Sequence, residues 1–140
     1  MRSSGAETHA RLVLDTSAYS QLRAGNAQVL EMLGRAASVL VPVTVIGELR
    51  GAFELGRRAR ENHVALDRFL EEPFVSVLPT TAEVALQYGR IYARQRIGGR
   101  PVAANDMWIA SATMDCGGHL VTFDGDFARI AGLPCTLLKA

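Results

Sequence analysis

The feature that most constrains this chain is the position of its acidic residues relative to its short apolar segments. Five acids stand where an apolar segment ends or where a predicted helix begins: Asp15, Glu48, Asp106, Asp124 and Asp126. Short apolar runs bounded by turn residues are typical of strands buried in a parallel sheet, whose carboxyl ends form a ligand-binding crevice. Carboxylates gathered there repel one another unless a cation or shared protons compensate. The sequence therefore predicts an acidic cluster that holds a divalent metal.

Short apolar runs alternate with helical stretches along most of the chain. Strands are predicted at residues 11–14, 39–41, 74–78, 119–122 and 136–138. Helices are predicted at residues 17–23, 26–36, 42–56, 58–70, 80–97 and 106–116. Strands separated by helices form a parallel sheet with right-handed crossovers and helices on both faces. The predicted fold class is therefore α/β, a three-layer α/β/α sandwich.

Residues with capping preferences mark two of the predicted helix starts. Thr80 with Glu83 fits the capping-box pattern, and Thr81 is the alternative cap for the same helix. Asn105 is a good N-cap for a helix that begins at Asp106. This assignment places Asp106 in the first turn of a helix, at the same edge of the sheet as the strand ends.

Length and composition predict one globular domain. The 140 residues are enough for a substantial core, and no apolar run approaches the ~20 residues that a membrane helix requires. Residues 1–9 lack the apolar segment of a secretory signal and are predicted to form a flexible tail before a single domain at 10–140. Cys116 and Cys135 match no metal or redox spacing, so two buried thiols are favoured over a disulfide. We expect a cytoplasmic protein with no membrane association.

The net charge of +1 conceals an asymmetry. If five of the fourteen acidic residues line one pocket, the rest of the surface is basic, and fourteen of the fifteen basic residues are Arg. Arg suits phosphate recognition because its planar fork binds two oxygens at once. A genome rich in G+C would favour Arg codons equally well, so both interpretations stand.

Each acid also has an ordinary structural interpretation. Asp15 could accept a backbone hydrogen bond in a turn, Asp106 could favour the positive end of a helix dipole, and Glu48 could face solvent. Asp124 and Asp126 could belong to an ordinary Asp-Gly-Asp turn. Glu48 argues most strongly for function, because an acid among apolar neighbours is usually paired or ligated. If the acids converge, replacing Asp15 or Asp106 by Asn should stabilise the metal-free fold, whereas a structural acid would lose stability.

An all-oxygen ligand set predicts Mg²⁺, with Mn²⁺ able to substitute. Mg²⁺ takes carboxylate, water and phosphate oxygens, whereas the three His residues are scattered and form no zinc-type cluster. Two such ions ~3.5–4 Å apart can activate a water and stabilise the leaving oxygen of a phosphodiester. Four carboxylates carry the charge that neutralises two divalent ions. These requirements point to phosphodiester cleavage.

Four segments, taken in order, resemble PIN-domain ribonucleases of the VapC toxin type: VLDTS, PVTVIGEL, ANDMWIASA and LVTFDGDF. The resemblance extends from residue 11 to the end of the chain. It implies Asp15, Glu48, Asp106 and Asp124 as the catalytic, metal-binding quartet, with Asp126 as an additional or alternative ligand. Four further positions would support the site by orienting a carboxylate or touching phosphate: Thr16, Ser17, Asn105 and Thr122.

The same resemblance implies a PIN-like parallel sheet of four to five strands and a homodimer. It also implies a cognate antitoxin protein whose C-terminal segment blocks the site, and cleavage of structured RNA such as tRNA or rRNA. We therefore expect a metal-dependent endoribonuclease, the toxin of a toxin–antitoxin pair. It would hydrolyse RNA phosphodiester bonds by attack of metal-activated water, without a covalent intermediate.

Three other functions place acids at the end of a parallel sheet. A phosphotransfer receiver would need an aspartate after the third strand and a late lysine, but no acid follows Leu78 there and Lys139 is the only Lys. A phosphohydrolase with an aspartate nucleophile would need an acid where Ser17 stands. A catalytically idle PIN-like protein-binding module is the remaining alternative, and RNA cleavage distinguishes it.

Aromatic and basic residues near these motifs give weaker signals. Trp108 and Tyr19 are predicted to pack in the core rather than to stack on RNA bases. Four Arg residues could line an RNA path, contact the antitoxin, or form a solvated helix face: Arg50, Arg57, Arg58 and Arg60.

Overall fold

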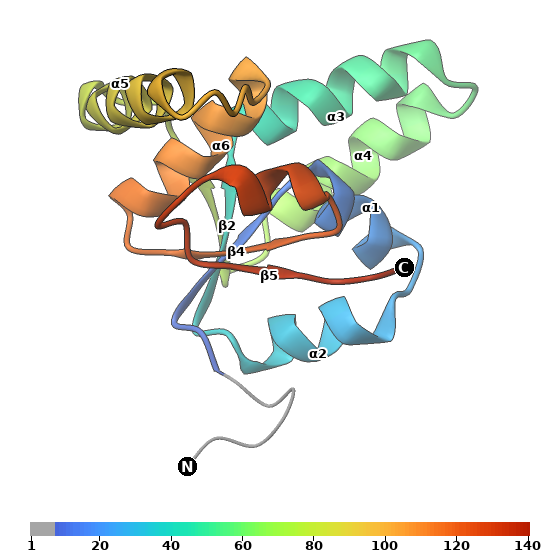
Figure 1. Cartoon of the computed structure of the whole chain (residues 1–140). Helices are drawn as coiled ribbons and strands as arrows, with labels where there is room; N and C mark the ends of the chain where they lie inside the picture. The colour runs from blue at the N-terminus through green and yellow to red at the C-terminus, as the bar shows by residue number, and fades with distance from the viewer. Residues whose placement is uncertain (1–7) are drawn as a thin grey trace.

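The computed structural model describes residues 8–140 (Figure 1). Within this range one sheet contains five parallel strands in the order β3-β2-β1-β4-β5. The strands are β1 (Arg11–Leu14), β2 (Ser38–Pro42), β3 (Val75–Leu78), β4 (His119–Thr122) and β5 (Cys135–Leu137). The predicted α/β class and the parallel sheet of four to five strands are confirmed.

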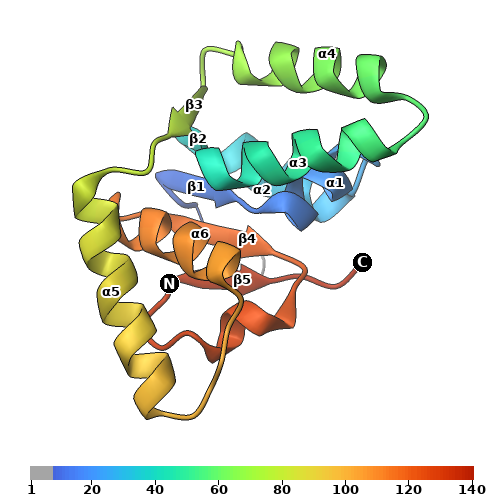
Figure 2. The same cartoon turned by 90° about the horizontal axis from the view of Figure 1, so that it is seen from above.

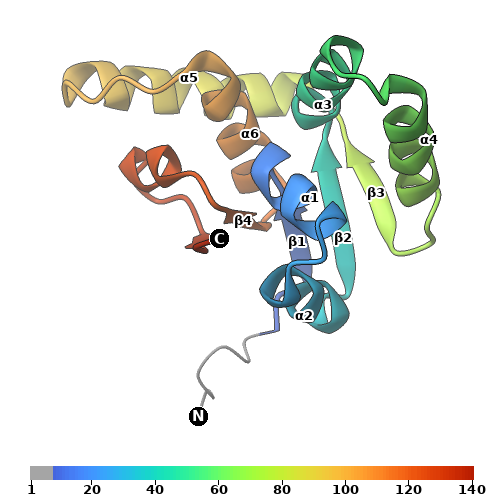
Figure 3. The same cartoon turned by 90° about the vertical axis from the view of Figure 1, so that its right-hand side faces the viewer.

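Six α-helices surround the sheet in the described part of the chain. They are α1 (Thr16–Arg23), α2 (Ala27–Arg35), α3 (Val43–Leu55), α4 (Ala59–Leu70), α5 (Ala82–Ile97) and α6 (Ala104–Asp115). Figures 2 and 3 show α1, α2 and α4 on one face of the sheet and α6, with α5 against it, on the other. The predicted three-layer sandwich is therefore confirmed. The helix α3 continues directly from β2 and carries Glu48 near the strand ends.

The central strand β1 positions the site. Its apolar residues Leu12, Val13 and Leu14 are completely buried, which explains a continuously apolar rather than alternating sequence. Burying each such side chain contributes about 1.5–3 kcal/mol before the entropy cost of ordering it. Because β1 pairs with both β2 and β4, Asp15 emerges beside Thr122, the last residue of β4.

The structure decides between the two predicted caps of α5 and corrects the predicted cap of α6. Thr81 rather than Thr80 caps α5, and its hydroxyl accepts a backbone hydrogen bond at 3.2 Å. The prediction that Asn105 caps the next helix is wrong, because α6 begins at Ala104, two residues before the predicted start at Asp106, and its N-cap is Ala103. Asn105 therefore lies within the first turn of α6, where its side chain is available for a tertiary contact.

A short 3-10 helix, η1 (Gly125–Arg129), follows β4 where the sequence predicted only a turn. Cys116 and Cys135 are both free thiols, as expected. Most of the predicted N-terminal tail lies outside the described residues, but the His9 ring stacks on His119 with centroids 3.7 Å apart. Across residues 8–140, every helix is too short or too polar to cross a bilayer.

Candidate metal centre

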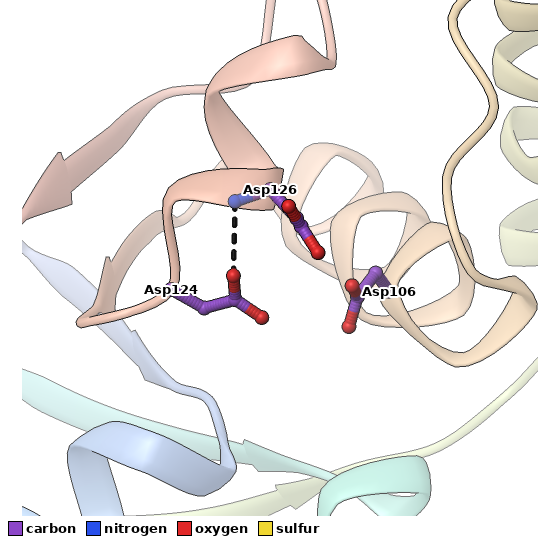
Figure 4. Close-up of side chains that lie close together, drawn as sticks. All are labelled: Asp106, Asp124 and Asp126. Carbon is purple, nitrogen blue, oxygen red and sulfur yellow. Dashed lines mark hydrogen bonds between the residues drawn. The ribbon is translucent and has the colours of Figure 1, made fainter.

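Three carboxylates converge beyond the carboxyl end of β4 (Figure 4). Asp106, Asp124 and Asp126 each offer one oxygen, and these oxygens all lie within 4.8 Å of one another. Asp106 comes from the first turn of α6, while Asp124 and Asp126 come from the start of η1. All three side chains are at least partly exposed, so an ion can reach them from solvent. A hard divalent cation such as Mg²⁺ suits this donor set.

The conformation of η1 sets the geometry of two of these acids. Asp124 caps η1, and its Oδ1 accepts a hydrogen bond from the Asp126 backbone N–H at 2.9 Å. The Asp124 backbone N–H in turn donates to Thr122 Oγ1 at 2.9 Å. In Figure 4 the carboxylates of Asp124 and Asp126 both point toward Asp106. The two acids of the Asp-Gly-Asp segment thus face the same space.

Asp15 is the most deeply buried of the five acids, with 3% of its surface exposed. It caps α1: its Oδ1 accepts from Ala18 N at 2.8 Å and Ser17 Oγ at 2.7 Å, and its Oδ2 accepts from the Thr122 hydroxyl. Burial raises the pKa of Asp15, these hydrogen bonds oppose the rise, and the charge of Asp124 adds to it. Asp15 therefore supports the fold as well as the site, so its replacement by Asn is expected to destabilise the metal-free protein, contrary to the expectation from charge repulsion alone.

Glu48 is held by two other helices. The Thr16 hydroxyl on α1 donates to its Oε1 at 2.6 Å, and the Asn105 amide on α6 donates to its Oε2 at 3.1 Å. These contacts are the pairing that the apolar surroundings of Glu48 led us to expect. They tie α1, α3 and α6 together at the strand ends, so the position of Glu48 is set by tertiary contacts.

The five carboxylates also act on one another electrostatically. The pKa of Asp106 is raised to about 6, first by burial and then by the charges of Asp124, Glu48, Asp126 and Asp15, in that order. No residue in the described range donates a hydrogen bond to the Asp106 side chain. Its charge is therefore uncompensated by the protein, and a bound cation would relieve the repulsion.

The structure brings the predicted acids to one region but gives them different surroundings. The three acids of α6 and η1 meet directly, whereas Asp15 and Glu48 are each fixed by hydrogen bonds at the border of the cluster. The four predicted supporting residues each donate a side-chain hydrogen bond to Asp15 or Glu48: Thr16, Ser17, Asn105 and Thr122. Of these four side chains, only that of Thr122 also contacts the three-acid cluster, by accepting from the Asp124 backbone N–H.

Asp126 has a charged neighbour, Arg129, that was not predicted from the sequence. Arg129 Nη2 lies 3.7 Å from Asp126 Oδ1, across one turn of η1. A separation of three residues brings side chains together on a helix but not in an extended turn. Because η1 was not predicted, the pairing of Asp126 with Arg129 could not be anticipated.

Residues 12–133 match the PIN domain, which is most of the chain and includes all five acids. This chain belongs to the PIN-domain family. The predicted family resemblance is thus confirmed for nearly the whole length over which the four motifs are spread. Among proteins with curated descriptions, none matches this PIN domain.

Solved structures of toxin–antitoxin proteins have folds similar to this PIN domain. VapBC2 from Rickettsia felis, bound to a promoter DNA fragment, is 20% identical over 92% of this chain and 99% of that chain, with a TM-score of 0.81. VapBC-5 from Mycobacterium tuberculosis is 25% identical over 94% and 99%, with a TM-score of 0.72. VapC20 from the same organism, a sarcin–ricin loop cleaving toxin, is 22% identical over 87% and 95%, with a TM-score of 0.66.

Proposed function

We propose that this PIN domain is a metal-dependent endoribonuclease. The observation that carries the proposal is the convergence of Asp106, Asp124 and Asp126 within 4.8 Å at the carboxyl edge of the sheet. Their oxygens fit Mg²⁺ or Mn²⁺. When bound, such ions polarise a phosphate oxygen and lower the pKa of a coordinated water. The description of VapC20 as a toxin that cleaves the sarcin–ricin loop supports structured RNA, such as rRNA or tRNA, as the substrate class.

The residues would divide the work according to their surroundings. Asp106, Asp124 and Asp126 would hold the cation, because their carboxylates face one another and have few or no other partners. Asp15 and Glu48 would complete the negatively charged site from fixed positions, since each is oriented by hydroxyl or amide donors. Carboxylates fixed in this way would hold the cation in place and, through the cation so held, would orient the scissile phosphate without a reorganisation cost at the moment of reaction.

Cleavage of RNA by the purified chain tests the proposal. Labelled RNA should be cut with Mg²⁺ or Mn²⁺, and EDTA should stop the reaction. Asp106→Asn should abolish cleavage, whereas the matched control Asp115→Asn, at the exposed far end of the same helix, should cut normally. Cleavage that persists after thorough chelation would contradict the metal dependence. A chain that binds a protein partner but never cuts RNA would instead be an idle binding module.

We further propose that the enzyme is the toxin of a toxin–antitoxin pair, acts in the cytoplasm and forms a homodimer. The fold shared with VapBC-5, a member of the VapBC toxin–antitoxin family, supports this proposal. Expression of this chain alone should slow the growth of the host cells, and co-expression of a small neighbouring gene, which would encode the antitoxin, should restore their growth. The molar mass of the purified protein, measured by light scattering, would test the homodimer. Harmless expression of a chain that cuts RNA in vitro would remove the toxin role and leave the nuclease.

A further inference from the structure

The surface beside α5 carries an uncompensated positive charge. Between residues 84 and 105 the sequence has no acid and four exposed arginines: Arg90, Arg94, Arg96 and Arg100. Across residues 8–140, none of these four guanidinium groups pairs with a carboxylate. The Arg cluster on α3 and α4 is different, because Arg50 pairs with Asp67 and Arg58 with Glu61, each at 2.6 Å. In the described part of the chain, the arginines of α5 and its following loop thus all lack a carboxylate partner, whereas at the α3–α4 end only Arg57 and Arg60 lack one.

Two hollows lie against this surface and share residues 99–101. One, of 340 Å³, is lined in part by Tyr92, Arg96, Arg100 and Met107. The other, of 400 Å³, is lined by the same loop together with Arg129. Neither hollow is lined by an acidic residue. The loop at residues 99–101 thus lines both hollows and lies between α5 and the Arg129 side chain.

Arg129 connects the second hollow to the metal centre. Arg129 donates to the Pro101 carbonyl at 3.5 Å and also lies 3.7 Å from Asp126. The buried Gln95 amide joins the two walls, donating to the carbonyls of Arg100 at 2.8 Å and Arg129 at 3.1 Å. The loop after α5 and η1, which Figure 2 shows on the same side of the sheet, are therefore held together.

An exposed aromatic ring lines the first of these hollows. Tyr92 is 45% exposed and precedes Arg96 by one helical turn. The Arg96 guanidinium lies over the Tyr92 ring, 5.9 Å from its centroid, and donates to its hydroxyl at 3.2 Å. A ring fixed in this way offers a stacking surface for a base, next to a cation for the adjoining phosphate.

We propose that Tyr92, Arg96, Arg100 and Arg129 form a track that guides a single-stranded RNA segment to the carboxylate cluster. Arg96 and Arg100 bind backbone phosphates and Tyr92 stacks on a base. Arg129 offsets the repulsion between the strand and Asp126. RNA fits this track better than an acidic protein segment, because the track combines a stacking ring with Arg and leads into the site for a scissile phosphate. The assignment rests on the proposed nuclease function.

Binding of a labelled single-stranded RNA, measured by anisotropy in EDTA over a salt series, tests the track. The variant Arg96→Gln with Arg100→Gln should bind roughly tenfold more weakly, and its plot of log affinity against log salt should flatten by about 1.4, since each phosphate contact on a single strand contributes about 0.7. The matched control, Arg57→Gln with Arg60→Gln, removes the same charge from the exposed α3–α4 end and should match wild type. Tyr92→Ala should bind roughly tenfold more weakly with an unchanged salt slope, whereas Tyr92→Phe should bind well.

The outcomes separate this inference from the nuclease function. Equal losses in both double variants, or no loss in either, would overturn the track, as would a wild type that fails to bind single-stranded RNA. Loss of a protein partner's binding in place of RNA binding would overturn it too. If the track variant alone loses RNA affinity but wild type never cuts RNA with Mg²⁺ or Mn²⁺, the nuclease proposal fails and the track stands.

Discussion

Replacing Asp106 by Asn removes one charge from the cluster and keeps the size of the side chain. The pKa of Asp106 is raised from 3.8 to about 6, a difference that corresponds to about 3 kcal/mol at 1.36 kcal/mol per unit. The side chain is partly exposed, so solvent screening reduces this to about 1.5–2 kcal/mol. Asn also loses the attraction between the carboxylate and the N-terminus of α6, which lowers the expected stabilisation by about 0.5 kcal/mol. We therefore expect Asp106→Asn to stabilise the metal-free protein by about 1 kcal/mol.

The size of this stabilisation depends on pH. Because folding raises the pKa of Asp106, the fold is favoured while the group is protonated, and this stability is lost as the pH rises through the folded pKa of about 6. The advantage of Asn should therefore be absent below about pH 4, where the Asp106 carboxyl is mostly neutral in the folded state, and complete above about pH 7.

Thermal melts in EDTA measure the prediction. At neutral pH the midpoint of Asp106→Asn should rise by about 3–4 °C, since 1 kcal/mol shifts a domain of this size by that amount. RNA cleavage in Mg²⁺ should be lost, while Asp115→Asn should melt and cut like wild type. A midpoint that falls by the same amount at acidic and neutral pH would refute the reasoning, because it would show that Asp106 stabilises the fold.

Three further substitutions have expected outcomes. Asp15→Asn should destabilise the metal-free protein by about 1 kcal/mol in denaturant titrations, because Asn keeps the Oδ1 that caps α1 but replaces Oδ2, the acceptor of the buried Thr122 hydroxyl, by an amide nitrogen; a more stable variant would contradict this role of Oδ2. Asn105→Ala should leave the helical circular dichroism unchanged, since Ala103 is the cap, but reduce RNA cleavage by releasing Glu48; unaltered cleavage would show that this contact is dispensable. Tyr19→Phe should raise the free energy of unfolding by about 1 kcal/mol, because the buried Tyr19 hydroxyl has no partner among residues 8–140. A lower free energy of unfolding in chemical denaturation would show that the hydroxyl has a hydrogen-bond partner.

The architecture could be predicted from local patterns. Residues 11–14 are an apolar run buried on both faces, so this strand had to lie inside a parallel sheet. A parallel sheet places the carboxyl ends of its strands at one edge, which is why Asp15 and the Asp124–Asp126 segment could be expected near one another. Tyr19 likewise packs in the core, with 2% of its surface exposed.

Helix boundaries were less predictable, because they depend on one-residue choices that tertiary contacts decide. Asn105 has a strong preference for N-cap positions, yet α6 begins at Ala104, and the Asn105 amide donates to Glu48 instead. The contact joins residues 57 positions apart. Local propensity contains no information about such a partner.

The sequence alone therefore determined the fold class, the edge of the sheet where the acids gather and the all-oxygen chemistry of that edge. These follow from the periodicity of apolar residues and from residue type. Only the tertiary structure decided that Asp106 meets the two acids of η1 while Asp15 and Glu48 stay hydrogen-bonded beside them. It also decided that Arg129 lies beside Asp126. Distances of a few ångströms depend on how α6 and the unpredicted η1 pack, and packing is a property of the whole chain.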